Sequence, residues 1–136
     1  MKNILFLLAL TAGVWADATI RVGGAKWASV QNNGILRVQN APTGELESNG
    51  TIRRNGAKIG EVDSKGRLRI DGALVGEIGK DGSLIYGGQK IGSIEANGEI
   101  KRKGNVWGQV EGLDDKTRRG VAVMLLVFRD DFVPKQ

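Results

Sequence analysis

The chain lacks the side chains on which most enzyme chemistry depends. It contains no His and no Cys among its 136 residues. A Ser-His-Asp triad, a histidine general base, thiol catalysis and thiolate or imidazole metal sites are therefore excluded. Adjacent acids occur at Asp114 with Asp115 and at Asp130 with Asp131, but such pairs in polar turns usually cap helices or face solvent. We expect no catalytic residue, no cofactor and no metal site.

Aromatic and basic side chains are the remaining candidates for ligand recognition. The candidate ligand-binding residues are Trp27, Trp107, Tyr86, Arg54 and Arg102. The chain has a net charge of +5, and a positive surface favours an anionic polymer such as an acidic glycan of the cell envelope. The residues do not identify the partner. The two candidate partners are an anionic envelope polymer and another envelope protein, and nucleic acid is not expected.

An internal repeat positions these candidates. Cut from residue 17 in blocks of sixteen, the chain reads DATIRVGGAKWASVQN, NGILRVQNAPTGELES, NGTIRRNGAKIGEVDS, KGRLRIDGALVGEIGK, DGSLIYGGQKIGSIEA and NGEIKRKGNVWGQVEG, without insertion or deletion. Gly recurs at the second, eighth and twelfth positions of the block. The domain organisation is therefore residues 17–112 as a hairpin-repeat domain and residues 113–136 as a C-terminal segment packing on it.

Each block is predicted to be a β-hairpin. The pair Asn55-Gly56, at positions seven and eight, suits a two-residue type I′ turn, in which both central residues have positive φ. This turn places Ile52 opposite Ile59.

The joint between blocks is predicted to be a three-residue loop that ends in Gly66 in the left-handed region, which places Val62 opposite Leu68. Gly60, at position twelve, is then expected to be a bulge or a sharp bend. Without it, Ile59 and Val62 would lie on opposite faces of one strand.

Positions four, eleven and fourteen of the block are predicted to face inward. One apolar set in a two-stranded hairpin is at best marginally stable, so the hairpins must pack on each other. About twelve short strands can close into a ring or continue as an open solenoid with capped ends. Trp27 and Trp107 occupy position eleven of the first and last blocks and are neighbours only in a ring, which we favour. The fold class is all-β, with six 16-residue hairpin repeats around a pseudo-rotational axis.

Position five has a basic residue in five of the six blocks. One interpretation is a binding stripe for a polyanion. The favoured interpretation is structural, because the predicted register places Glu45 opposite Arg53 and Glu61 opposite Arg69 as cross-strand pairs. The stripe consists of Arg21, Arg37, Arg53, Arg69 and Lys101.

The run of xGxIRxxGxxIGxI blocks resembles the five-fold β-flower family of exported bacterial repeat proteins over about residues 17 to 112. The resemblance implies short hairpins around a pseudo-rotational axis and an apolar, Phe-containing C-terminal stretch, here VAVMLLVF. It implies no activity. The first block departs from the motif, with Ala18 and Ala28 in place of Gly, and the second has Asn40 and Pro42 in its turn region.

Residues 1–16, MKNILFLLALTAGVWA, have the pattern of a secretory signal peptide. Lys2 precedes a short apolar run, and small residues place the cleavage site after Ala16 or Ala18. The lack of Cys excludes a lipobox. We expect a periplasmic or secreted protein with no transmembrane span after cleavage, since the apolar run is too short to cross a bilayer.

Two segments follow the last block. LDDKTRRG is predicted to be a polar turn or a short helical turn. The apolar run from Val121 to Phe128 is predicted to be a buried strand or a plug under the ring, with a membrane-surface or partner-binding segment as the alternative.

The sequence therefore predicts an exported, non-enzymatic structural or binding module of the cell envelope or extracellular space. The alternatives are an envelope-polymer (anionic glycan) binding protein and an oligomeric surface component. A carboxylate-dependent hydrolase is disfavoured, because the blocks are equal in length and contain no irregular loop to hold catalytic acids.

Overall fold

The computed structural model describes residues 17 to 133, so the predicted signal peptide lies outside the described residues. Each sixteen-residue block forms a hairpin of two short antiparallel strands, and one helix follows the last block. The elements are β1 (Asp17–Val22), β2 (Ala25–Gln31), β3 (Ile35–Val38), β4 (Ala41–Leu46), β5 (Thr51–Arg54), β6 (Ala57–Val62), β7 (Arg67–Ile70), β8 (Ala73–Ile78), β9 (Ser83–Tyr86), β10 (Gln89–Ile94), β11 (Glu99–Arg102), β12 (Asn105–Glu111) and α2 (Asp115–Val127).

The twelve strands close into a barrel in which each strand pairs with its neighbours in the sequence. The ring is completed by antiparallel pairing of β1 with β12, which places Ile20 opposite Val110. A closed ring leaves no unpaired sheet edge. The prediction of an all-β ring of hairpins is therefore confirmed, and the open solenoid is excluded.

The barrel has two different ends, because a meander alternates its two kinds of connection. The hairpin turns at positions seven and eight lie at one end, here called the tip rim. The joints between blocks lie at the other end, here called the joint rim. Asn55 and Gly56 have φ values of 50° and 87°, as the type I′ turn requires. At the joint, Gly66 has φ 84° and Val62 pairs with Leu68, so both turn predictions are confirmed.

One detail of the hairpin register was predicted wrongly. Ile52 pairs with Gly60, and the pairing shifts between Lys58 and Gly60, so the bulged residue is Ile59. A Cβ at Gly60 would clash with the carbonyl oxygen of Arg69 on the neighbouring strand. Position twelve is glycine in five of the six blocks because two backbones approach closely there, and the bulge lies one residue before it.

The barrel interior is lined mainly by positions four and fourteen. Position four is completely buried in every block, and position fourteen is at most 8% exposed in five blocks. Position eleven is more varied: Trp27 and Ile91 are buried, and the others are half-buried. Position six also faces the interior, because it shares the face of position four along the same strand. The position-four residues are Ile20, Leu36, Ile52, Leu68, Leu84 and Ile100.

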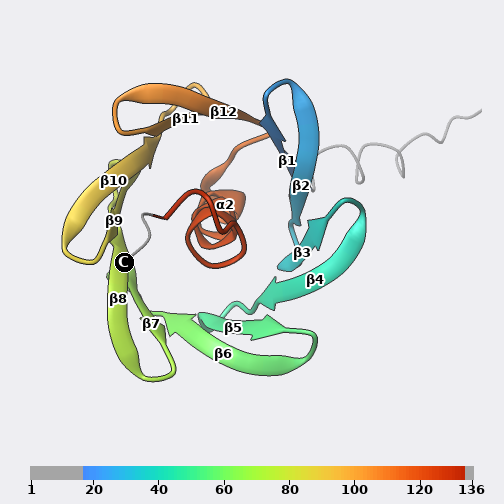
Figure 1. The fold of residues 1–136 in the computed structure, drawn as a ribbon. Coiled ribbons are helices and arrows are strands. Elements are labelled where there is room, and N and C mark those ends of the chain that lie inside the picture. Colours follow the sequence, from blue (N-terminus) through green and yellow to red (C-terminus); the bar gives the residue numbers. More distant parts are fainter. Residues whose placement is uncertain (1–16, 134–136) are drawn as a thin grey trace, which may run out of the picture.

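The apolar C-terminal run is a plug, as one alternative predicted, but it is a helix and not a strand. α2 lies inside the ring of strands (Figure 1), and its residues from Val121 to Leu126 are at most 5% exposed. The closed barrel offers no free edge, so a buried segment can pair its backbone polar groups only within itself. The stretch predicted as a polar turn or a short helical turn supplies the N-cap and the first half of this helix, which is longer than one turn and is capped reciprocally by Asp114 and Thr117.

Candidate functional site

Trp27 and Trp107 both contact Arg129, a side chain of the C-terminal segment, at the tip rim. The guanidinium carbon of Arg129 lies 5.0 Å from the centre of the Trp27 ring and 5.1 Å from that of Trp107. Arg129 also bonds Asp131, with 2.6 Å between Nε and Oδ1. Trp107 packs edge to face on buried Phe132, with ring centres 5.0 Å apart. The two indoles therefore form one aromatic cluster across the seam of the ring.

Arg54, in the β5–β6 hairpin, and Arg102, in the same β11–β12 hairpin as Trp107, also contact the C-terminal segment. The Arg54 guanidinium lies 4.7 Å from the Phe128 ring centre, and its Nη2 donates to the carbonyl of Val127 at 3.2 Å. Arg54 thus places a cation at the end of a helix whose own last turn has no basic residue. Arg102 Nε donates to the carbonyl of Phe132 at 2.8 Å.

Four of the candidate ligand-binding residues therefore bind the chain's own C-terminal segment. The fifth, Tyr86, is half-buried against the core. Tyr86, Arg54 and Arg102 all occupy position six. The sequence signal that identifies them is the period of two along a strand, which places position six beside position four. The sequence prediction included neither the shared face of these three residues nor the contacts of Arg54 and Arg102 with the C-terminal segment.

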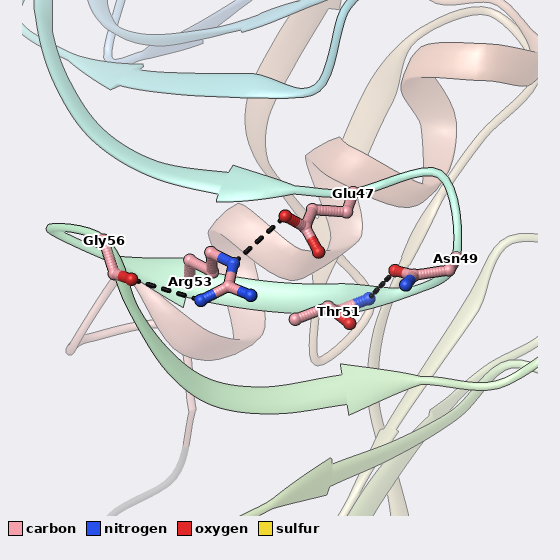
Figure 2. A network of polar contacts seen from close by, with 5 residues as sticks. All are labelled: Glu47, Asn49, Thr51, Arg53 and Gly56. Carbon is pink, nitrogen blue, oxygen red and sulfur yellow. Dashed lines mark hydrogen bonds and ion pairs between the residues drawn. The ribbon is translucent and has the colours of Figure 1, made fainter.

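Three of the four position-five arginines, Arg21, Arg37 and Arg53, connect elements of the barrel wall. Glu45 and Glu61 do lie opposite Arg53 and Arg69, but the ion pair of Arg53 has a different partner. Arg53 Nε bonds Glu47 Oε2 at 3.0 Å, and its Nη1 donates to the carbonyl of Gly56 at 3.2 Å (Figure 2).

The Arg53 arrangement recurs around the ring. Arg37 bonds Gln31 and the Asn40 carbonyl in the same way, and Arg21 pairs with Glu111 across the seam at 3.1 Å. Each of these arginines links position five to position fifteen of the block before it. Such exposed pairs contribute about 0 to 1 kcal/mol each, and they support the structural interpretation of the stripe.

The joint rim contains a cleft of about 500 Å³. It lies between the first half of α2 and the joints that connect β2 to β3 and β4 to β5. The helix packs mainly against β1 and β2, so it stands off from the joints on this side. The volume is within the range of about 300 to 1,000 Å³ that is usual for small-molecule sites. The lining residues are Val30, Gln31, Asn32, Asn33, Gly34, Leu46, Glu47, Ser48, Gly50, Asp115, Arg119 and Gly120.

Among the side chains that the structure describes, Arg119 is the one cation in the lining of this cleft. Its side chain is half-buried and forms no hydrogen bond or ion pair with any residue between 17 and 133. The cleft also contains the carboxylates of Asp115 and Glu47. Asp115 is exposed in the first turn of α2, where a carboxylate is favoured by the helix dipole.

Three polar side chains of the cleft each have one atom held by the barrel and one atom without a partner in the described part of the chain. Arg37 Nε donates to Gln31 Oε1 at 3.3 Å, and the Gln31 amide nitrogen has no partner among the described residues. Arg53 Nε donates to Glu47 Oε2, and Glu47 Oε1 has no partner there. The Ile35 backbone N–H donates to Asn33 Oδ1 at 3.1 Å, and the Asn33 amide nitrogen likewise has no partner in that part of the chain. The cleft thus presents prepositioned donors and acceptors.

The two pairs of adjacent acids have structural partners. Asp114 accepts a hydrogen bond from the Thr117 backbone N–H at 2.8 Å as the cap of α2. The hydrogen bond from Arg129 lowers the pKa of Asp131 below its usual range, so this carboxylate is ionised at neutral pH. Within residues 17 to 133 no group of three or more acidic side chains could hold a metal ion. Over the same residues, no helix combines the length and the apolar content needed to cross a bilayer.

Comparison with models of protein families, with curated proteins and with solved structures finds no match to this chain.

Proposed function

We propose that the protein is an exported, non-enzymatic binding module of the cell envelope or the extracellular space. The observation that supports this function is the joint-rim cleft, where unpaired Arg119 and partly free polar side chains surround an open space. Of the five other candidate side chains, four are engaged by the C-terminal segment and Tyr86 is half-buried against the core. The cleft is therefore the surface best suited to a ligand.

Export is supported by the N-terminal pattern and by the place where the barrel begins. β1 starts at Asp17, and Ala18 is completely buried opposite Val30. Cleavage after Ala16 leaves this strand intact, whereas cleavage after Ala18 removes a buried residue. The structure of the first strand thus favours the Ala16 site among the two alternatives.

A non-catalytic role is supported by the use of the acids and by the lack of His and Cys. Asp114 caps α2 and Asp131 pairs with Arg129, so each of the two acid pairs has a member in a structural contact. The ring of hairpins with a central apolar segment agrees with what the β-flower resemblance implies. The ring has six hairpins where that family is five-fold, and membership remains a prediction.

The proposed function is tested by blocking the cleft in protein immobilised on beads. Ser48 is an exposed residue of the joint that lines the cleft, and Ser48→Trp would fill this space. Ser64 is exposed at the same position of the next joint and does not line the cleft, so Ser64→Trp is the matched control. The readout is retention of soluble polysaccharide from a bacterial envelope extract.

We expect the wild type and Ser64→Trp to retain polysaccharide and Ser48→Trp to lose most of this retention. Equal retention by all three proteins would move binding away from the cleft, to the position-five arginines. No retention by any of them would leave a structural role and refute the binding module.

A role as an oligomeric surface component receives less support. The two large hydrophobic residues exposed within residues 17 to 133 are Leu74 at 57% and Val106 at 62%. They lie in β8 and β12, which are separated by the three strands β9, β10 and β11, so they do not form one patch. Light scattering coupled to size exclusion should therefore report a monomer.

A further inference from the structure

We propose that the joint-rim cleft holds one carboxylated sugar unit of a larger glycan, with its carboxylate bound by Arg119. This inference rests on the proposed function, since it names the ligand class of the same cleft. It goes further by assigning a chemical group to each part of the site.

Arg119 accounts for the carboxylate. A half-buried guanidinium without a counter-ion is partly desolvated and is stabilised by an anion that enters the cleft. The planar fork of N–H donors matches the two oxygens of a carboxylate and can bind them in a bidentate manner. Glu47 does not neutralise this charge, because Arg53 holds it at 3.0 Å. Asp115, four residues before Arg119, makes no ion pair with it in this structure.

The free atoms of Gln31, Asn33 and Glu47 account for the sugar hydroxyls. A hydroxyl group both donates and accepts, so it can pair with the amide nitrogens of Gln31 and Asn33 and with Glu47 Oε1. Each of these side chains is already held by a second hydrogen bond to the barrel. These side chains therefore lose less conformational entropy when a ligand binds, which favours affinity.

The wall of the cleft accounts for the carbon face of a sugar ring. Val30, Leu46 and Gly120 contribute apolar surface between the polar groups. Gly120 packs directly on Val30, since a Cβ there would lie 2.5 Å from Val30 Cγ1. No aromatic residue between 17 and 133 lines this cleft, so stacking is absent and we expect a weak site with a Kd of about 0.1 to 1 mM.

The test uses trigalacturonate as the probe, titrated into the purified protein and followed by two-dimensional amide NMR. Its methyl ester, which has the same ring and no charge, tests the carboxylate. Inorganic phosphate tests a site for any small anion. Arg119→Gln removes the guanidinium, and Arg118→Gln is the matched control, because Arg118 is also half-buried on α2 and does not line the cleft.

We expect trigalacturonate to shift the amides of residues 31 to 34 and 46 to 50. We expect Arg119→Gln and the methyl ester each to weaken binding at least tenfold, and Arg118→Gln to leave it unchanged. Arg119→Lys keeps the charge without the fork and should lose part of the affinity. Thermal unfolding of each variant shows whether the fold is retained, and Arg119→Lys serves as the informative variant if Arg119→Gln unfolds.

Four results would overturn the inference. Equal binding of the methyl ester would show that the carboxylate is not recognised. Phosphate that binds as tightly at the same amides would indicate a general anion site and not a sugar site. Equal losses for Arg118→Gln and Arg119→Gln would show attraction by overall charge. If trigalacturonate fails to bind while Ser48→Trp still abolishes polysaccharide retention, the proposed function stands and the carboxylated-sugar assignment is wrong.

Discussion

The aromatic cluster at the seam predicts that Trp27 and Trp107 stabilise the protein cooperatively. The two indoles lie at 5.0 and 5.1 Å from the same guanidinium, that of Arg129. Trp27 is 8% exposed, so Trp27→Ala is expected to cost about 3 to 5 kcal/mol of unfolding free energy. Trp107 is half-buried and its replacement by Ala should cost less, about 2 to 3 kcal/mol.

The double variant should cost less than the sum of the single variants. Each cation–π contact contributes about 0.5 to 2 kcal/mol. Once one indole is removed, the guanidinium is held on one side only, so the second replacement loses a contact that is already weakened. We therefore expect a coupling of about 0.5 to 2 kcal/mol. This coupling should disappear when the same cycle is measured with Arg129→Ala.

Urea unfolding followed by far-ultraviolet circular dichroism measures the cycle without relying on the tryptophans that are removed. Ile59 provides the control, because it occupies the same block position in β6, six strands away from β12 around the twelve-strand ring. Trp107→Ala with Ile59→Ala should be additive within about 0.5 kcal/mol. If the Trp27 and Trp107 variants are equally additive, Arg129 does not link the two indoles in solution, and the reasoning is refuted.

Two further predictions concern the turns and the acid limb of stability. Gly56 has φ 87° and open space where a Cβ would lie. Gly56→Val should therefore lower the free energy of unfolding by about 1 to 3 kcal/mol through backbone strain, and Lys58→Val should lower it much less. Equal losses for the two variants in urea unfolding would contradict the predicted turn. Hydrogen bonds from the backbone and side chain of Arg67 and from the Lys65 backbone lower the pKa of Asp63 below its usual value. A carboxyl group whose pKa is lower in the folded state stabilises the fold above its unfolded-state pKa, and this stability is lost as pH falls through the folded-state pKa. Asp63→Asn should therefore reduce the fall in Tm below about pH 4. An unchanged dependence of Tm on pH in this acidic range would refute the prediction.

Much of the fold can be predicted from the sequence because its signals are local. Positive φ at positions seven and eight favours Gly, Asn and Asp, so Asn55 and Gly56 indicate the turn without reference to the rest of the chain. Gln39 and Lys103 adopt positive φ at position seven as well, where the repeat register and not the residue type indicates the turn. The equal block length then repeats one register six times, and closure follows from the need to pair every edge. The pairing of Val62 with Leu68 was predicted correctly for this reason.

Predictions failed where the outcome depends on contacts between distant segments. The run of eight apolar residues was predicted to be a buried strand or a plug, but periodicity alone does not distinguish a buried strand from a buried helix in so short a run. The decision comes from closure of the barrel, because α2 has no strand edge to pair with. The bulge at Ile59 similarly depends on the approach of the Arg69 carbonyl to Gly60, which the block alone does not reveal.

The sequence by itself determined the periodic frame of this protein, and tertiary structure decided which side chains remain available for a ligand. From the sequence, Arg54 and Arg102 were selected as candidate ligand-binding residues, and Arg119 was not singled out among the 20 basic residues. In the fold, the first two contact the C-terminal segment, whereas Arg119 lines an open cleft without a partner among residues 17 to 133. The physical reason is that a side chain's free hydrogen-bonding capacity depends on neighbours brought together by packing, and α2 stands off from only part of the joint rim.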